Sequence, residues 1–126
     1  MWKPRIVQRG ESATNLSGAV LFGILWDELV DLVGSAGTAV LMRRALRRAL
    51  LQSAELQELT IGRVDEDFGY VLPPSFNLTM GPSPALHHLA DELRPLLAEL
   101  TGEVALRHLG RVPELQVWMA AAPLAS

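Results

Sequence analysis

The sequence predicts an α+β fold with an N-terminal antiparallel helical hairpin, a small antiparallel sheet and a kinked leucine-rich helix. Two observations lead to this prediction. Apolar residues recur at helical spacing in most of 15–53 and in 84–109. Over 57–72 and 115–119 they instead alternate with polar or small residues, which is the period of a strand.

The helical hairpin is expected in the first half of the chain. Its first helix should cover about 15–33 and its second should end near Ser53, joined by a turn at Gly34–Thr38 whose first glycine stops the first helix. A connection this short makes two helices antiparallel neighbours. Glu28 is then level with Arg44, so we expect the acidic part of the first helix beside the basic part of the second.

The segment 57–72 is expected to form a β-hairpin. Its large apolar residues share one face only if the loop has an even number of residues, because a shift of one position turns every side chain to the other face. An even loop can pair Ile61 with Leu72 and Arg63 with Tyr70. We therefore predict an even-length loop with its acidic tip in solvent.

A leucine-rich helix is expected over 84–109. Ser83 as the cap, followed by Pro84 at the first helical position, is typical of a helix start. Pro95 should kink this helix or restart it, and Gly102 offers a second break. The alternating run 115–119 predicts a third strand beside the hairpin.

Composition limits the classes of protein and the surroundings to be considered. The chain fits one domain over 1–126, with an irregular lead-in at 1–13 and a loose tail at 120–126. It has no cysteine, which excludes disulfides, thiolate metal sites and cysteine nucleophiles. The apolar run over 12–26 is too short to span a bilayer and is followed at once by Asp27. We therefore expect a cytoplasmic chain without a membrane span.

Charge and hydropathy indicate what kind of partner to expect. The net charge of −3 is not that of a general nucleic-acid binder, so we do not expect nucleic acid as a partner. With 49% hydrophobic residues and a mean hydropathy of +0.22, the chain is rich in apolar residues for its size. Apolar surface left over after folding is usually covered by another subunit, which favours a homodimer.

A cluster of arginines is the strongest polar feature. Arg43, Arg44, Arg47 and Arg48 share one broad side of the second helix, because their spacing is i, i+1, i+4, i+5. Four guanidinium groups can bind phosphate or carboxylate, so these residues are a candidate anion site. The alternative is a solvated face that pairs with the acidic part of the first helix.

Histidines provide a second candidate site. His87 and Asp91, and likewise His88 and Glu92, lie four positions apart on the leucine-rich helix, and His108 can join them if that helix bends. These five residues are candidate ligands of a divalent metal. The alternative is an ordinary polar surface, since no metalloenzyme spacing such as H-E-x-x-H is present.

Small and aromatic residues of the first helix provide the third candidate. Gly18, Ala19 and Gly23 form a small-residue strip, and Phe22 and Trp26 lie beside it. The strip can be core packing or a dimer interface. It can also be the wall of an apolar ligand pocket that Phe68 and Tyr70 complete.

No catalytic constellation accompanies these features. The serines lack the context of a nucleophile, and phosphate-binding glycine motifs are missing. In element order alone, the chain resembles the vinyl-reductase-type and TRAPP-like ligand-binding and scaffolding domains. It lacks their cysteine-containing segment after the hairpin, so no residue is carried over.

These features favour binding over catalysis. We interpret the chain as a non-catalytic regulatory or adaptor module that acts through homodimerisation and binding of a protein partner. One alternative is a small-molecule-sensing domain with an apolar pocket. A further alternative is a metal-dependent protein that uses His87 and His88. The sequence assigns no cofactor.

Overall fold

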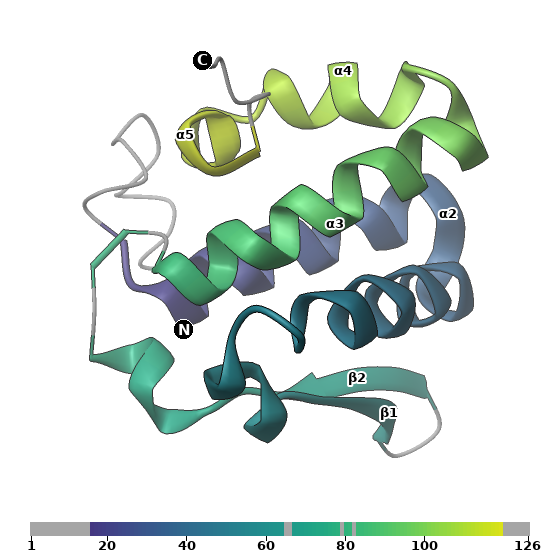
Figure 1. Ribbon diagram of the computed structural model, residues 1–126. Coiled ribbons are helices and arrows are strands. Elements are labelled where there is room, and N and C mark those ends of the chain that lie inside the picture. The colour runs from purple at the N-terminus through teal and green to yellow at the C-terminus, as the bar shows by residue number, and fades with distance from the viewer. Residues whose placement is uncertain (1–15, 65–66, 79, 82, 120–126) are drawn as a thin grey trace.

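A computed structural model describes residues 16–64, 67–78, 80–81 and 83–119, and the expected lead-in and tail lie outside this described part. Helices predominate and one antiparallel β-hairpin accompanies them, which confirms the α+β class in its broad form (Figure 1). The elements in chain order are α2 (Gly18–Ala49), η2 (Ala54–Glu58), β1 (Thr60–Val64), β2 (Asp67–Val71), η3 (Pro74–Asn77), α3 (Pro84–Thr101), α4 (Val104–Gly110), η4 (Pro113–Leu115) and α5 (Gln116–Met119).

The first half of the described chain forms one kinked helical element, α2, and no separate helical hairpin. Ser17 caps it, because its Oγ accepts from the Val20 amide at 3.2 Å. The only non-helical backbone inside α2 is at Gly34, with φ 82° and ψ 167°, a region that glycine alone occupies readily. Helical structure resumes at the next residue, and Thr38 Oγ1 donates to the Gly34 carbonyl at 2.7 Å. The expected five-residue turn is therefore reduced to one residue.

The kink of α2 is also joined to the sheet. Ser35, the residue after the kink, donates its hydroxyl to Asp67 Oδ1 at 2.5 Å, and the Phe68 amide donates to the same oxygen at 2.8 Å. These two bonds, the Ser35 bond first, lower the pKa of Asp67 from its ordinary value because they stabilise the carboxylate. The start of β2 thus lies directly against the point where α2 changes direction.

The β-hairpin has the even-length loop that the sequence predicts, but in a different register. Two residues, 65–66, connect β1 and β2, so the prediction of an even length is confirmed. Ile61 pairs with Tyr70 and Arg63 with Phe68, a shift of two positions from the expected partners. The turn is tighter because Asp67 already belongs to β2. A shift of two keeps every side chain on its face, so Ile61, Phe68 and Tyr70 still pack against the core.

The expected third strand over 115–119 is wrong, because this segment is helical. It comprises the end of η4 and all of α5, and the described sheet has two strands. Trp118 is 1% exposed and donates its indole N–H to the Leu86 carbonyl at 2.7 Å. Leu115 is also fully buried, three positions earlier, which is the spacing of one helical face. The alternating pattern placed Trp118 on the polar side, whereas it is one of the largest buried side chains.

The leucine-rich region forms two helices whose break lies after Pro95. Ser83 Oγ accepts from the Leu86 amide at 3.3 Å and Pro84 occupies the first turn, which confirms the predicted start. Pro95 is exposed and lies inside α3, so the expected restart there is wrong. The helix ends at Gly102, with φ 65°, where the sequence offered its second break.

The core lies between α2 and the helices that pack against it. Figure 1 shows α3 lying alongside the first part of α2, with the hairpin on one side and α4 and α5 on the other. Phe22 and Leu29 of α2, Leu93 of α3 and Trp118 of α5 are all buried in one apolar cluster. Within the described ranges, none of the helices has the length and apolar character needed to cross a membrane.

Candidate functional site

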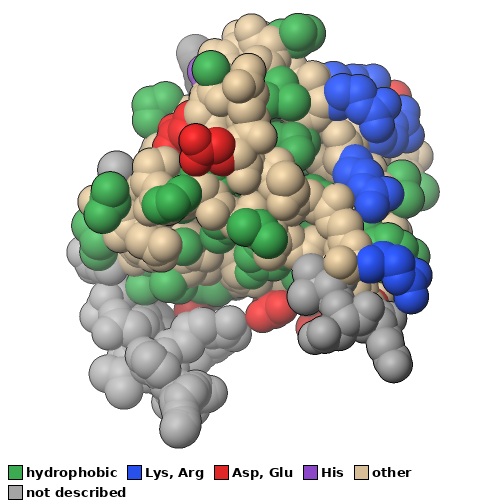
Figure 2. Space-filling view, turned by 90° about the horizontal axis from the view of Figure 1, so that it is seen from below, with side chains coloured by type: hydrophobic (Ala, Val, Ile, Leu, Met, Phe, Trp, Pro, Cys, Tyr) green, Lys and Arg blue, Asp and Glu red, His purple; other side chains and the backbone are tan. Residues whose placement is uncertain are grey.

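The arginine side of α2 is exposed and only partly used within the chain. All four arginines are exposed. Arg43 donates from Nε to the Ile61 carbonyl at 3.4 Å and lies 5.9 Å from the centre of the Phe68 ring, so it covers the hairpin. In the described part of the chain, Arg44, Arg47 and Arg48 make no hydrogen bond or ion pair. Figure 2 views the molecule from the hairpin side and shows lysine and arginine side chains gathered along one edge.

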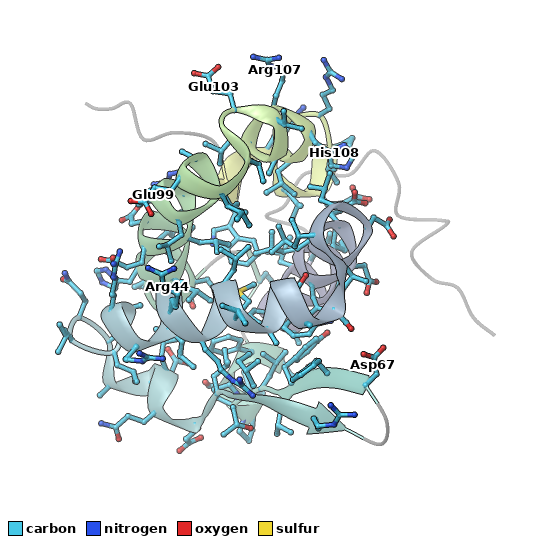
Figure 3. All side chains as sticks on the ribbon, turned by 90° about the vertical axis from the view of Figure 1, so that its right-hand side faces the viewer. Arg44, Asp67, Glu99, Glu103, Arg107 and His108 are labelled. Atoms are coloured by element: carbon cyan, nitrogen blue, oxygen red, sulfur yellow. The ribbon has the colours of Figure 1, made fainter. Side chains whose placement is uncertain are left out.

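The expected pairing of Glu28 with Arg44 is wrong, because Glu28 contacts another helix. Its Oε1 lies 2.7 Å from Nε2 of His108, in α4. The pairing assumed two helices folded back across a five-residue turn, whereas α2 bends at one residue. Arg44 instead lines a groove between α2 and α3, together with Glu99 of α3 (Figure 3).

The five candidate metal ligands are not brought together. Asp91 forms an ion pair with Arg94 in the next turn of α3. His108 lies on the other side of the fold, where its side chain contacts Glu28. Among the residues that the structure describes, no group of three or more histidine, aspartate and glutamate side chains is arranged to hold a metal ion. His87 is exposed and His88 is half-buried on the first turns of α3. This arrangement agrees with the alternative interpretation of the sequence, an ordinary polar surface.

The aromatic residues of the third candidate pack on one another. The Tyr70 ring lies 4.7 Å from Phe22 and 5.0 Å from Trp26, measured between ring centres. A Cβ on Gly23 would lie 3.1 Å from the Tyr70 hydroxyl, so this glycine allows β2 to approach α2. Burial raises the pKa of the Tyr70 hydroxyl, and the charge of Asp27 adds to this effect.

The rest of the small-residue strip also faces the chain's own elements. A Cβ on Gly18 would meet the Phe76 carbonyl at 3.2 Å, and Gly18 itself is buried. Ala19 is half-buried against the core. Phe68 is also half-buried, and Cζ of Arg63 lies 5.3 Å from the centre of its ring.

A groove of about 390 Å³ runs between the second part of α2 and the end of α3. Leu41 and Leu96 form its buried floor, while Val40 and Leu100 are 52% and 59% exposed. Arg44 lies on the α2 rim and Glu99 on the α3 rim, facing one another in Figure 3. We call the set Gly37, Val40, Leu41, Arg44, Leu96, Glu99 and Leu100 the α2–α3 groove.

A second cavity, of about 350 Å³, lies where α2 meets the end of α4 and η4. Its wall combines an imidazole, a guanidinium and two carboxylates with three apolar side chains. We call it the His108 cavity; it is lined by Ile24, Glu28, His108, Arg111, Val112, Pro113 and Glu114. Glu114 is 1% exposed, so one of the carboxylates belongs to the interior of the fold.

Sequence reasoning missed both cavities, and the reason is long-range packing. Glu28 and His108 are 80 positions apart, and each reads as an ordinary surface residue of its own helix. Glu114 gives no local signal of its burial either, since an acidic residue directly after Pro113 is what the first turn of an ordinary exposed helix contains.

Comparison with known proteins adds no relative. No family model, curated protein sequence or solved structure matches this chain.

Proposed function

We propose that this chain is a non-catalytic regulatory or adaptor module that forms a homodimer through the α2–α3 groove and, as a dimer, binds a protein partner. The observation that carries the proposal is the groove itself, which exposes Val40 and Leu100 between two rims of opposite charge. A cytoplasmic location is part of the same proposal.

The charges of the groove favour a second copy as its occupant. In a twofold dimer the same surface is used on both chains, and when the twofold axis runs along the groove each rim faces the other rim of the partner. We propose this orientation, because the alternative places like charges against one another. Arg44 of one copy then meets Glu99 of the other, and the reciprocal pair forms at the same time. Neither residue forms an ion pair within the described part of its own chain, so both are available.

Apolar contact supplies the rest of the interface. Val40 and Leu100 are more than half exposed, and Val104, at the start of α4, is 63% exposed. Burying such side chains in a dimer contributes about 25 cal/mol for each Å² of apolar surface removed from water. Charge pairing then determines the orientation more than the affinity.

The test is a pair of charge reversals. In Arg44→Glu both rims are acidic, and in Glu99→Arg both are basic, so each variant alone should have the mass of one chain, 13.7 kDa, in light scattering. An equimolar mixture should recover the mass of two chains, because each unlike pair is restored between the two variants. Wild-type protein with the mass of one chain, or a mixture that stays monomeric, contradicts the proposal.

A matched apolar pair checks that the groove and no other surface is responsible. Leu100→Asp should abolish the dimer. Leu78→Asp replaces a side chain that is 81% exposed and lies outside the groove, and it should leave the dimer intact. Equal effects of both substitutions would place the interface elsewhere.

The sensing alternative is favoured by a different observation. The aromatic residues expected to form its pocket pack together, whereas the His108 cavity has the mixed lining of a small-ligand site. The metal alternative has no comparable support, because its residues are spread over two sides of the fold.

A further inference from the structure

The His108 cavity has the size and lining of a site for a small molecule. Its volume of about 350 Å³ falls at the lower end of the range of ligand pockets, about 300–1,000 Å³. It lies between three elements, the middle of α2, the end of α4 and η4. The contact between His108 and Glu28 joins two of them, so the wall is held in place by the fold.

The charged groups of the wall have both signs. Glu28 and Glu114 contribute two carboxylates, and Arg111 contributes an exposed guanidinium at the end of α4. Glu114 is 1% exposed and already interacts with other groups of the chain, so its side chain is a fixed part of the wall. A ligand with a single charge would match only one of the two signs.

The uncharged part of the wall determines the body of the ligand. Ile24, Val112 and Pro113 supply apolar surface, and none of them carries a side-chain hydrogen-bonding group. A ligand that fits this wall therefore has a short aliphatic part between its two charged ends.

We propose that the His108 cavity binds a free amino acid with a small aliphatic side chain. The ammonium group lies toward Glu114 and Glu28, the carboxylate toward Arg111, and the side chain against Ile24 and Val112. Arginine binds a carboxylate through two parallel hydrogen bonds, which fixes the direction of the ligand. This inference does not depend on the dimer, because the cavity and the α2–α3 groove share no residue.

The experiment is a titration followed by amide NMR shifts, with L-valine, L-valinamide and N-acetyl-L-valine as probes. L-Valine has both charges, L-valinamide only the ammonium group and N-acetyl-L-valine only the carboxylate. Titration to about 10 mM detects dissociation constants in the millimolar range. We expect saturable shifts of His108, Arg111 and Val112 with L-valine, and binding of either one-ended analogue that is about tenfold weaker or more.

Two variants assign the ends of the ligand. Arg111→Gln should weaken L-valine and N-acetyl-L-valine by about tenfold and leave L-valinamide unchanged. Glu114→Gln, of the same shape, should weaken L-valine and L-valinamide instead. Arg107→Gln is the control, because Arg107 pairs with Glu103 on α4 and does not line the cavity. Arg111 is exposed, so its substitution tests the site even if the Glu114 variant does not fold.

Two results would overturn the proposal. The first is the absence of saturable shifts with L-valine. The second is equal binding of all three probes, which would show that the cavity does not recognise the ammonium group and the carboxylate of the ligand.

Discussion

Nε2 of His108 lies 2.7 Å from Oε1 of Glu28, which joins α4 to α2 across 80 positions of the chain. The two side chains are 43% and 25% exposed, so water weakens their interaction without removing it. We expect a double-mutant cycle with Glu28→Gln and His108→Gln to give a coupling of about 0.5–1 kcal/mol in the free energy of unfolding, measured by urea denaturation. Strictly additive effects would show that the contact does not join the helices in solution.

Gly34 permits the kink of α2, and no other residue does so without strain. An added Cβ would meet no atom within 4 Å, so the cost of Gly34→Ala arises from the backbone at φ 82° and ψ 167° alone. We expect a loss of about 1–3 kcal/mol in the free energy of unfolding, measured by urea denaturation. Gly110→Ala is the control: it also has open space, lies in α4 and has no positive φ, so it should be neutral or stabilising. Equal effects of both substitutions would contradict this account.

Gly34 and the contact between Glu28 and His108 show what the sequence could and could not predict. Gly34 was predicted to interrupt the helix because a glycine between two helical patterns is a local signal. The length of the interruption could not be predicted, since it depends on the hydrogen bond of the Thr38 hydroxyl and on the contact between Ser35 and Asp67 of β2. Glu28 and His108 gave no signal at all, because the contact between them exists only after α4 has packed on α2.

The C-terminal segment shows a different cause of error. Five residues are too few to distinguish alternation from a short helical turn, and the sequence pattern favoured a strand over 115–119. Tertiary contact favours the helical turn, in which the Trp118 ring is buried and its N–H donates to the Leu86 carbonyl. The hairpin at 57–72, with ten paired residues and a consistent face, was predicted correctly in kind.

Trp118 should therefore hold α5 on α3. Trp118→Phe keeps an aromatic ring but removes the donor to the Leu86 carbonyl and part of a fully buried side chain. We expect a loss of about 1–3 kcal/mol in the free energy of unfolding, and faster amide hydrogen exchange in α5. Unchanged exchange in α5 would show that the indole is not its anchor.

Tyr70 predicts how stability depends on alkaline pH. It is the only tyrosine in the chain, so its ionisation can be followed directly by phenolate absorbance. Burial, and then the charge of Asp27, raise the pKa of its hydroxyl above the ordinary value near 10. The native absorbance midpoint should therefore lie at a higher pH than the midpoint in concentrated urea, and equal midpoints would contradict the burial of this ring.

The consequence for folding follows from which state ionises first. Below pH 10 the tyrosine is neutral in both states, and its contribution to stability is fully present. As the pH rises from 10 toward the raised pKa of the folded protein, the unfolded chain loses its proton first, so the free energy of unfolding falls. Tyr70→Phe keeps the ring between Phe22 and Trp26 but has no proton to lose. Urea denaturation at several pH values should show this part of the decline in the wild type and not in the variant, and an equal decline in both would assign it to other groups.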